Sequence, residues 1–78
     1  MNLEKEVKSI ISNLSGKEEV FDKDSLQDDL GLDSFSLVVM LVEFEDFFGI
    51  ELQESDMNPF DLITVADAIE LVEKYYEE

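Results

Sequence analysis

Apolar residues recur at helical spacing in three separate stretches of this 78-residue chain. The first stretch has Leu3, Val7, Ile10, Ile11 and Leu14. The second has a stripe at Leu37, Leu41, Phe44 and Phe48, with Met40 alongside. The third has Val65, Ala68, Ile69, Val72 and Tyr76. Residues three or four apart share one face of a helix, so the pattern predicts three amphipathic helices.

Capping residues mark where these helices begin and end. Asn2 and Thr64 can accept the free N–H groups at a helix start, and Asp67 completes a capping box with Thr64. Gly16 and Gly49 follow the first two stretches, in the position of a C-terminal glycine. The predicted helices therefore end at about these two glycines.

Two connecting segments complete the prediction. Residues 17–32 show no steady period, and we expect a long loop that is held to the core by Val20, Phe21, Leu26, Leu30 and Leu32. Asparagine is favoured as a helix cap and proline at the first helical position, so Asn58 and Pro59 predict a helix start. We expect this short helix to end near Leu62. The predicted fold is all-α, a small four-helix bundle of three main helices plus one short helix, in a single domain over residues 1–78.

Charge limits the partners of such a chain. Twenty-one acids and five lysines give a net charge of −16, and residues 24 to 73 contain fourteen acids and no base. This surface would repel nucleic acid and anionic membranes and attract basic proteins. The longest apolar run has six residues, far below the length of a membrane span, and the N-terminus lacks the apolar core of a signal peptide. We expect a soluble cytoplasmic protein that does not insert into membranes.

The residue inventory argues against catalysis. The chain has no histidine and no cysteine, so the commonest general base and the strongest side-chain nucleophile are absent. Residues 22–33 resemble a calcium-binding loop only loosely, because Leu26 and Gln27 stand where an oxygen ligand and a glycine are needed. We expect no enzymatic activity and no specific metal site.

The second predicted helix carries another apolar stripe, formed by Phe35, Val39 and Val42 and continued by Asp46. A globular helix usually keeps that side polar. The stripe could be buried in the fold, form a dimer contact, or serve as a docking surface inside an acidic rim. We expect a monomer with a docking surface, although the sequence leaves the dimer contact open.

Asp33 and Ser34 lie where this helix starts. Both residue types are favoured there, because their side chains accept free backbone N–H groups. The same N–H groups and the helix dipole favour negative charge, so a phosphate esterified to Ser34 would be stabilised. Physical chemistry thus permits a phosphodiester at Ser34 and does not require one.

The whole chain resembles the acyl carrier protein family. The stretch DDLGLDSFSLV is similar to the family's D-L-G-x-D-S-L motif, with matches at Asp29, Leu30, Gly31, Asp33 and Ser34. Phe35 stands where leucine is usual. FEDFFGIEL and ITVADAIELV resemble two further family segments at the expected spacing.

The resemblance implies a 4′-phosphopantetheine group on Ser34, attached from coenzyme A by a phosphopantetheinyl transferase. Cargo would be carried as a thioester on the terminal thiol, and Asp33 would help the transferase and orient the site. The second helix would contact loading and transferring enzymes that have basic and apolar docking surfaces. Its candidate contacts are Phe35, Val39, Val42, Glu45 and Asp46.

The sequence says less about the chemical class of the cargo. Carriers of fatty-acid synthesis resemble one another in having acids two and five residues after the serine, where this chain has Ser36 and Val39. Residues 55–64 resemble those of aminoacyl and peptidyl carriers. We expect a free-standing carrier of acyl groups in fatty-acid-like, polyketide or other specialised biosynthesis. An aminoacyl, peptidyl or D-alanyl carrier is the alternative, and an acidic protein-binding module without a prosthetic group is an alternative of another class.

Overall fold

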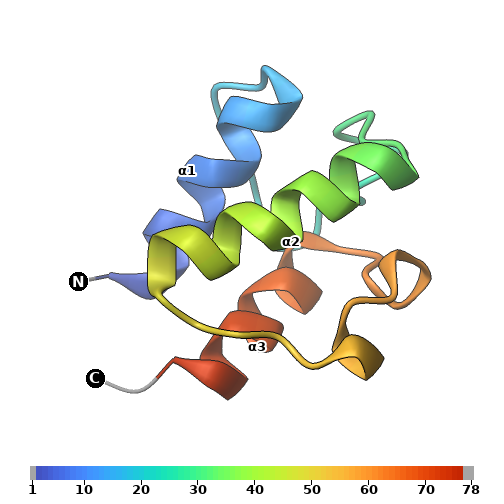
Figure 1. The fold of residues 1–78 in the computed structure, drawn as a ribbon. Helices are drawn as coiled ribbons and strands as arrows, with labels where there is room; N and C mark the ends of the chain where they lie inside the picture. Colours follow the sequence, from blue (N-terminus) through green and yellow to red (C-terminus); the bar gives the residue numbers. More distant parts are fainter. Residues whose placement is uncertain (1, 77–78) are drawn as a thin grey trace.

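The computed structural model describes residues 2–76 and is a bundle of three α-helices (Figure 1). The helices are α1 (Leu3–Ser15), α2 (Ser34–Phe48) and α3 (Val65–Tyr75). Two 3-10 turns, η1 (Glu54–Asp56) and η2 (Pro59–Asp61), lie between α2 and α3. The predicted helical bundle is confirmed. Its short fourth helix is present as the single turn η2, and η1 is an addition that the sequence pattern did not predict.

The predicted capping residues delimit the helices. The Asn2 side chain accepts a first-turn N–H group of α1. The Thr64 hydroxyl accepts the Asp67 N–H at 3.3 Å, and the Asp67 carboxylate accepts the Thr64 N–H at 3.0 Å, which completes the capping box. Gly16 and Gly49 end α1 and α2 in the left-handed conformation, where a residue with a Cβ atom would be strained.

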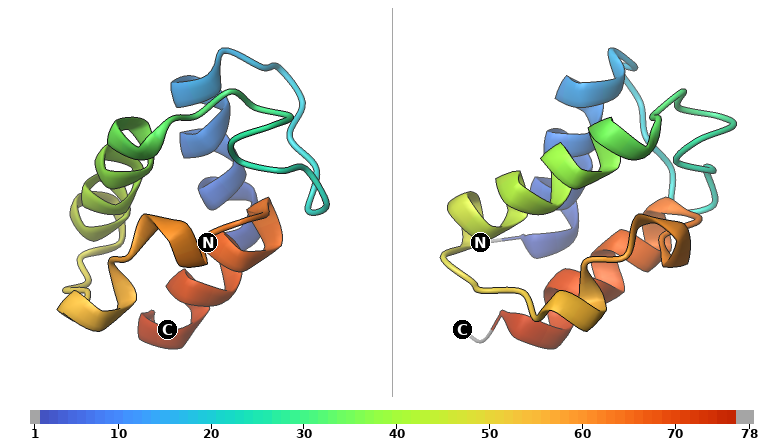
Figure 2. Two further views of the ribbon diagram at one scale, coloured as in Figure 1. Left: turned by 90° about the vertical axis from the view of Figure 1, so that its right-hand side faces the viewer. Right: turned by 45° about the vertical axis from the view of Figure 1, so that its right-hand side comes forward.

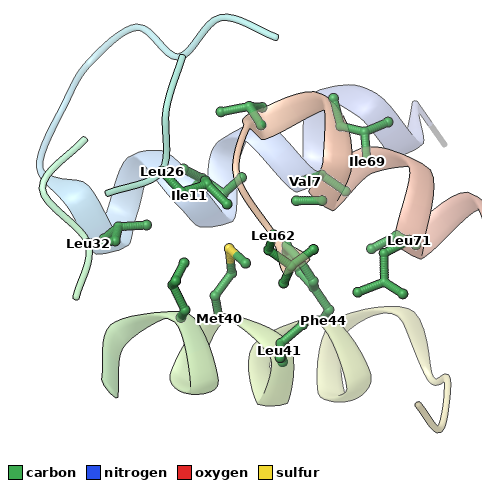
Figure 3. Close-up of a cluster of buried hydrophobic side chains, with 14 of the residues drawn as sticks. Val7, Ile11, Leu26, Leu32, Met40, Leu41, Phe44, Leu62, Ile69 and Leu71 are labelled. Atoms are coloured by element: carbon green, nitrogen blue, oxygen red, sulfur yellow. The ribbon is translucent and has the colours of Figure 1, made fainter. Parts of the chain in front are cut away.

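α1 packs against both α2 and α3, and η2 packs against α2 (Figure 2). The core lies between these elements, and Figure 3 shows Met40 and Phe44 pointing into it from α2. The predicted core stripe of α2 is confirmed, because all its members are buried: Leu37, Met40, Leu41, Phe44 and Phe48. Leu71 of α3 is also buried, and the sequence pattern had missed it.

Two predicted core positions differ from the structure: Tyr76 is confirmed only in part, and Phe21 is wrong. Tyr76 lies just beyond α3 and is half-buried, with its ring 5.6 Å from that of Phe48 in an edge contact. Phe21 is exposed, because the chain turns sharply there and the Asp24 carboxylate accepts its N–H at 2.9 Å. The other apolar residues of the first loop are buried or half-buried, as expected.

The first loop is fastened to the start of α3 by backbone hydrogen bonds. The Leu26 N–H donates to the Ile63 carbonyl at 2.9 Å, and the Val65 N–H donates to the Asp24 carbonyl at 3.0 Å. Leu32 in turn donates to the Leu26 carbonyl at 2.9 Å. This ladder fixes the chain immediately before α2, where Ser34 lies.

Candidate functional site

Ser34 is the exposed first residue of α2, and Asp33 is the residue that caps the helix. The Asp33 carboxylate accepts the Ser36 N–H at 2.8 Å. The Ser34 hydroxyl is therefore not needed as the helix cap. Buried Leu32 and the left-handed Gly31 hold the preceding turn in place. The fold thus presents the Ser34 side chain to solvent from a well-anchored start of α2.

The electrostatics of this helix start suit a phosphate ester. Backbone N–H groups at the beginning of α2 carry partial positive charge, and the first turn contains no acidic residue. The hydrogen bond from the Ser36 N–H lowers the pKa of Asp33, because it stabilises the charged carboxylate. Asp33 and a phosphodiester on Ser34 would then be two anions that share one helix N-terminus.

The exposed side of α2 is largely apolar. Phe35 is 66% exposed, and Val42 is also exposed, as the second stripe predicted. Val39 is only half-buried and contributes less. Val38 and Phe47 are exposed as well, and sequence reasoning missed both. Val38 lies three residues after Phe35 and four before Val42, a spacing that could have revealed it. Val38 and Phe47 are nine residues apart and so project from opposite edges of the exposed side, and we call Phe35, Val38 and Val42 the α2 face.

The two acids predicted as partner contacts have different surroundings. Asp46 is exposed and lies beside the α2 face, together with exposed Glu43. Glu45 is half-buried, and its carboxylate accepts the Leu52 N–H at 2.9 Å. Glu45 therefore stabilises the chain that follows α2, whereas Asp46 and Glu43 give the α2 face an acidic rim.

The described part of the chain has neither a metal-binding cluster nor a membrane span. No group of three or more metal-ligating side chains occurs among residues 2–76. None of the helices described there is both long and apolar enough to cross a bilayer.

Comparison with known proteins places this site in a family. A family model described as the phosphopantetheine attachment site matches residues 5–72, nearly the whole chain. The acyl carrier protein of Desulforapulum autotrophicum is 42% identical over 77 residues, which cover 95% of this chain and 97% of that protein. The acyl carrier protein of Thermotoga maritima is 40% identical over 70 residues, which cover 87% of this chain and 84% of that protein.

Solved structures agree on the fold. A crystal structure of an acyl carrier protein from Thermotoga maritima superimposes with a TM-score of 0.74 at 25% identity, over 94% of this chain and 89% of that one. The solution structure of the apo doublet acyl carrier protein from prodigiosin biosynthesis gives a TM-score of 0.78 at 23% identity. That match covers 97% of this chain and 37% of the doublet, and it bears on the fold alone.

A small helical bundle with a phosphopantetheine attachment site defines the class of carrier domains. This chain belongs to the acyl carrier protein family. Members of that family are carriers and not catalysts, and 4′-phosphopantetheine is their prosthetic group.

Proposed function

We propose that the protein carries acyl groups as thioesters on a 4′-phosphopantetheine arm attached to Ser34. The observation that supports this most directly is the exposure of Ser34 at the start of α2, beside Asp33 and inside the matched region. Such a carrier would serve fatty-acid-like, polyketide or other specialised biosynthesis.

The residues around Ser34 fit a phosphate-linked arm. The Ser34 oxygen would form the new phosphodiester bond as coenzyme A loses 3′,5′-ADP, and its proton would pass to a base on the transferase, since this chain has no histidine. The N–H groups at the start of α2 would stabilise the phosphodiester charge. The bound arm supplies a thiol, which the cysteine-free chain lacks.

Thiol titration tests this assignment with little background, because the unmodified chain has no cysteine. We expect one thiol per molecule after incubation with coenzyme A and a phosphopantetheinyl transferase, none with Ser34→Ala, and one with the matched control Ser36→Ala. Loss of the thiol in Ser36→Ala with retention in Ser34→Ala would overturn the assignment.

We further propose that partner enzymes dock on the α2 face. The exposed apolar side chains there, rimmed by Asp46 and Glu43, are complementary to a basic surface with an apolar centre. The transferase itself is a convenient probe. Phe35→Ala and Val42→Ala should raise its KM several-fold, whereas Phe21→Ala, which truncates an exposed ring outside α2, should not. Equal KM values for all three variants would contradict this docking surface.

A further inference from the structure

Every lysine of the chain lies beside an acid. The Lys8 ammonium pairs with Glu4 and Asp22. The Lys74 ammonium pairs with Asp56. The other three lysines have acids as direct neighbours in the sequence: Lys5 has Glu4 and Glu6, Lys17 has Glu18, and Lys23 has Asp22 and Asp24. The five positive charges are therefore each offset locally, and the net charge of −16 acts on the surroundings of the whole molecule.

The start of α2 lies within this negative field. Asp33 is adjacent to Ser34, and the exposed Asp28 and Asp29 belong to the turn just before it (Figure 1). The Gly31 N–H closes this turn on the Gln27 carbonyl at 3.1 Å. Extended chain would place Asp28 at most about 21 Å from Ser34, and the turn brings it closer.

α2 and the elements packed against it add more acids than bases. α1 and η2 are the elements that pack against α2. Their charged residues are Glu43, Glu45 and Asp46 on α2, Glu4, Lys5, Glu6 and Lys8 on α1, and Asp61 on η2. The positive end of the α2 dipole acts mainly within the first turn, next to the phosphodiester.

An arm on Ser34 would keep its thiol inside the field. The arm has about fourteen bonds between the serine oxygen and the sulfur, and it extends to about 17 Å. This length is similar to the shortest dimension of the molecule, which is 18 Å. At an ionic strength of about 10 mM, charges act over about 30 Å, so the thiol feels the acids wherever the arm points.

We propose that the acidic surface keeps the arm's thiol protonated and unreactive in the free carrier, and that a basic partner releases it on docking. This inference rests on the proposed attachment at Ser34. Nearby negative charge disfavours a thiolate, and the thiolate is the nucleophile in acyl transfer. Positive groups of a docked partner would offset the field. The thiol proton would then pass to a base of the partner, the new sulfur–acyl bond would form, and the donor's thiolate would leave.

The ionisation of the thiol tests this inference without a partner enzyme. Thiolate absorbance against pH would be compared between the loaded protein, with the unloaded protein as blank, and free 4′-phosphopantetheine. At about 10 mM salt the protein-bound thiol should titrate at higher pH. Uncharged iodoacetamide should alkylate it about three- to ten-fold more slowly near neutral pH, and the cysteine-free chain offers no competing thiol. A short oligolysine peptide should restore most of the rate, and an oligoglutamate peptide should not.

Two variants of equal charge change test where the field originates. Asp28→Lys reverses a charge close to Ser34. Glu73→Lys reverses one a turn before Tyr76, whose ring contacts Phe48 at the opposite end of α2, a helix about 21 Å long. At low salt Asp28→Lys should raise the alkylation rate about two-fold, and Glu73→Lys should raise it less. No effect of Asp28→Lys, or a larger effect of Glu73→Lys, would contradict the inference.

Salt separates this account from simple shielding of the thiol. At about 1 M salt the differences from free 4′-phosphopantetheine should largely disappear. Slow alkylation that salt does not change would mean that the protein covers the thiol, and it would overturn the inference. A loaded protein whose thiol titrates and reacts like the free compound at low salt would overturn the inference alone. Absence of the mass gain on loading would overturn the proposed function as well.

Discussion

Asp33 and Ser34 have separate tasks at the start of α2, although both are residue types that cap helices. The Asp33 carboxylate accepts the hydrogen bond from the Ser36 N–H. The Ser34 hydroxyl makes no capping bond and is exposed at the first helical position. The sequence could predict a helix start here, because both residues are favoured at that place. It could not decide which of them caps, since that depends on the backbone conformation at Asp33, which is extended.

Because Asp33 and not Ser34 caps α2, substitutions at these two positions should affect stability differently. Ser34→Ala should change the free energy of unfolding by less than about 0.5 kcal/mol, because the residue is exposed and makes no capping bond. Asp33→Ala should destabilise clearly more, and Asp33→Asn should restore most of the loss, since asparagine also caps well. Urea denaturation of the three variants measures this. A larger loss for Ser34→Ala than for Asp33→Ala would show that the cap is misassigned.

Two aspartates should make stability depend on acid pH. The Ser36 N–H lowers the pKa of Asp33, and the Tyr75 hydroxyl followed by Lys74 lowers the pKa of Asp56. Each carboxylate therefore stabilises the fold fully above its unfolded-state pKa of about 3.9, and this stabilisation is lost as the pH falls through the lower folded-state pKa. Urea midpoints between pH 7 and pH 3 should fall less steeply for Asp33→Asn and Asp56→Asn than for the unchanged chain. The same pH dependence of the urea midpoint in the variants and in the unchanged chain would refute this role of the two carboxylates.

Helix α2 both fills the core and presents an outer surface, and the sequence fully predicted only its core side. The stripe from Leu37 to Phe48 gave the core side, because burial follows helical period. On the outer side, Phe35 and Val42 are exposed as predicted, whereas Val39 is half-buried and the exposed Val38 was not predicted. All six residues from 37 to 42 are apolar, so their period alone cannot separate two adjoining faces.

The connection between α2 and α3 depends on contacts that sequence patterns do not show. Asp56 of η1 pairs with Lys74 at 3.1 Å and accepts the Tyr75 hydroxyl, while the Tyr75 oxygen accepts the Gln53 N–H at 3.2 Å. These partners are about twenty residues apart in the chain, and neither helical period nor turn propensity links them. They fasten η1 to the end of α3.

Tyr75→Phe tests this fastening. The substitution removes the hydroxyl that both Asp56 and the Gln53 N–H use, and we expect a loss of about 0.5–1.5 kcal/mol in the free energy of unfolding. Amide hydrogen exchange should accelerate at Gln53 and its neighbours more than in α1. As a control, Tyr76→Phe alters the neighbouring tyrosine, which contacts the Phe48 ring. Similar exchange in both variants would mean that the Tyr75 hydroxyl does not hold the connection.

The distribution of charge over the molecule affects both its stability and its choice of partners. Residues 24 to 73 hold fourteen acids without a base, and they include the α2 face. Lys74 is the nearest cation after this segment, and its ammonium is paired with Asp56. Repulsion among these acids disfavours the compact state, and the same negative charge attracts basic partners.

Salt should therefore stabilise the fold. We expect the melting temperature to rise with sodium chloride, because screening weakens the repulsion, and to rise further with millimolar magnesium through loose binding to the acids. Differential scanning calorimetry at constant pH measures both effects. A melting temperature that is independent of salt would contradict this account of the acidic surface.

Mass spectrometry of the intact protein can show whether Ser34 bears the phosphopantetheine arm. After incubation with coenzyme A and a phosphopantetheinyl transferase, the intact protein should gain the mass of one phosphopantetheine, and fragmentation should place that mass on Ser34. A folded protein that gains no mass, or a gain that fragmentation places on Ser36 or another residue, would contradict the claim.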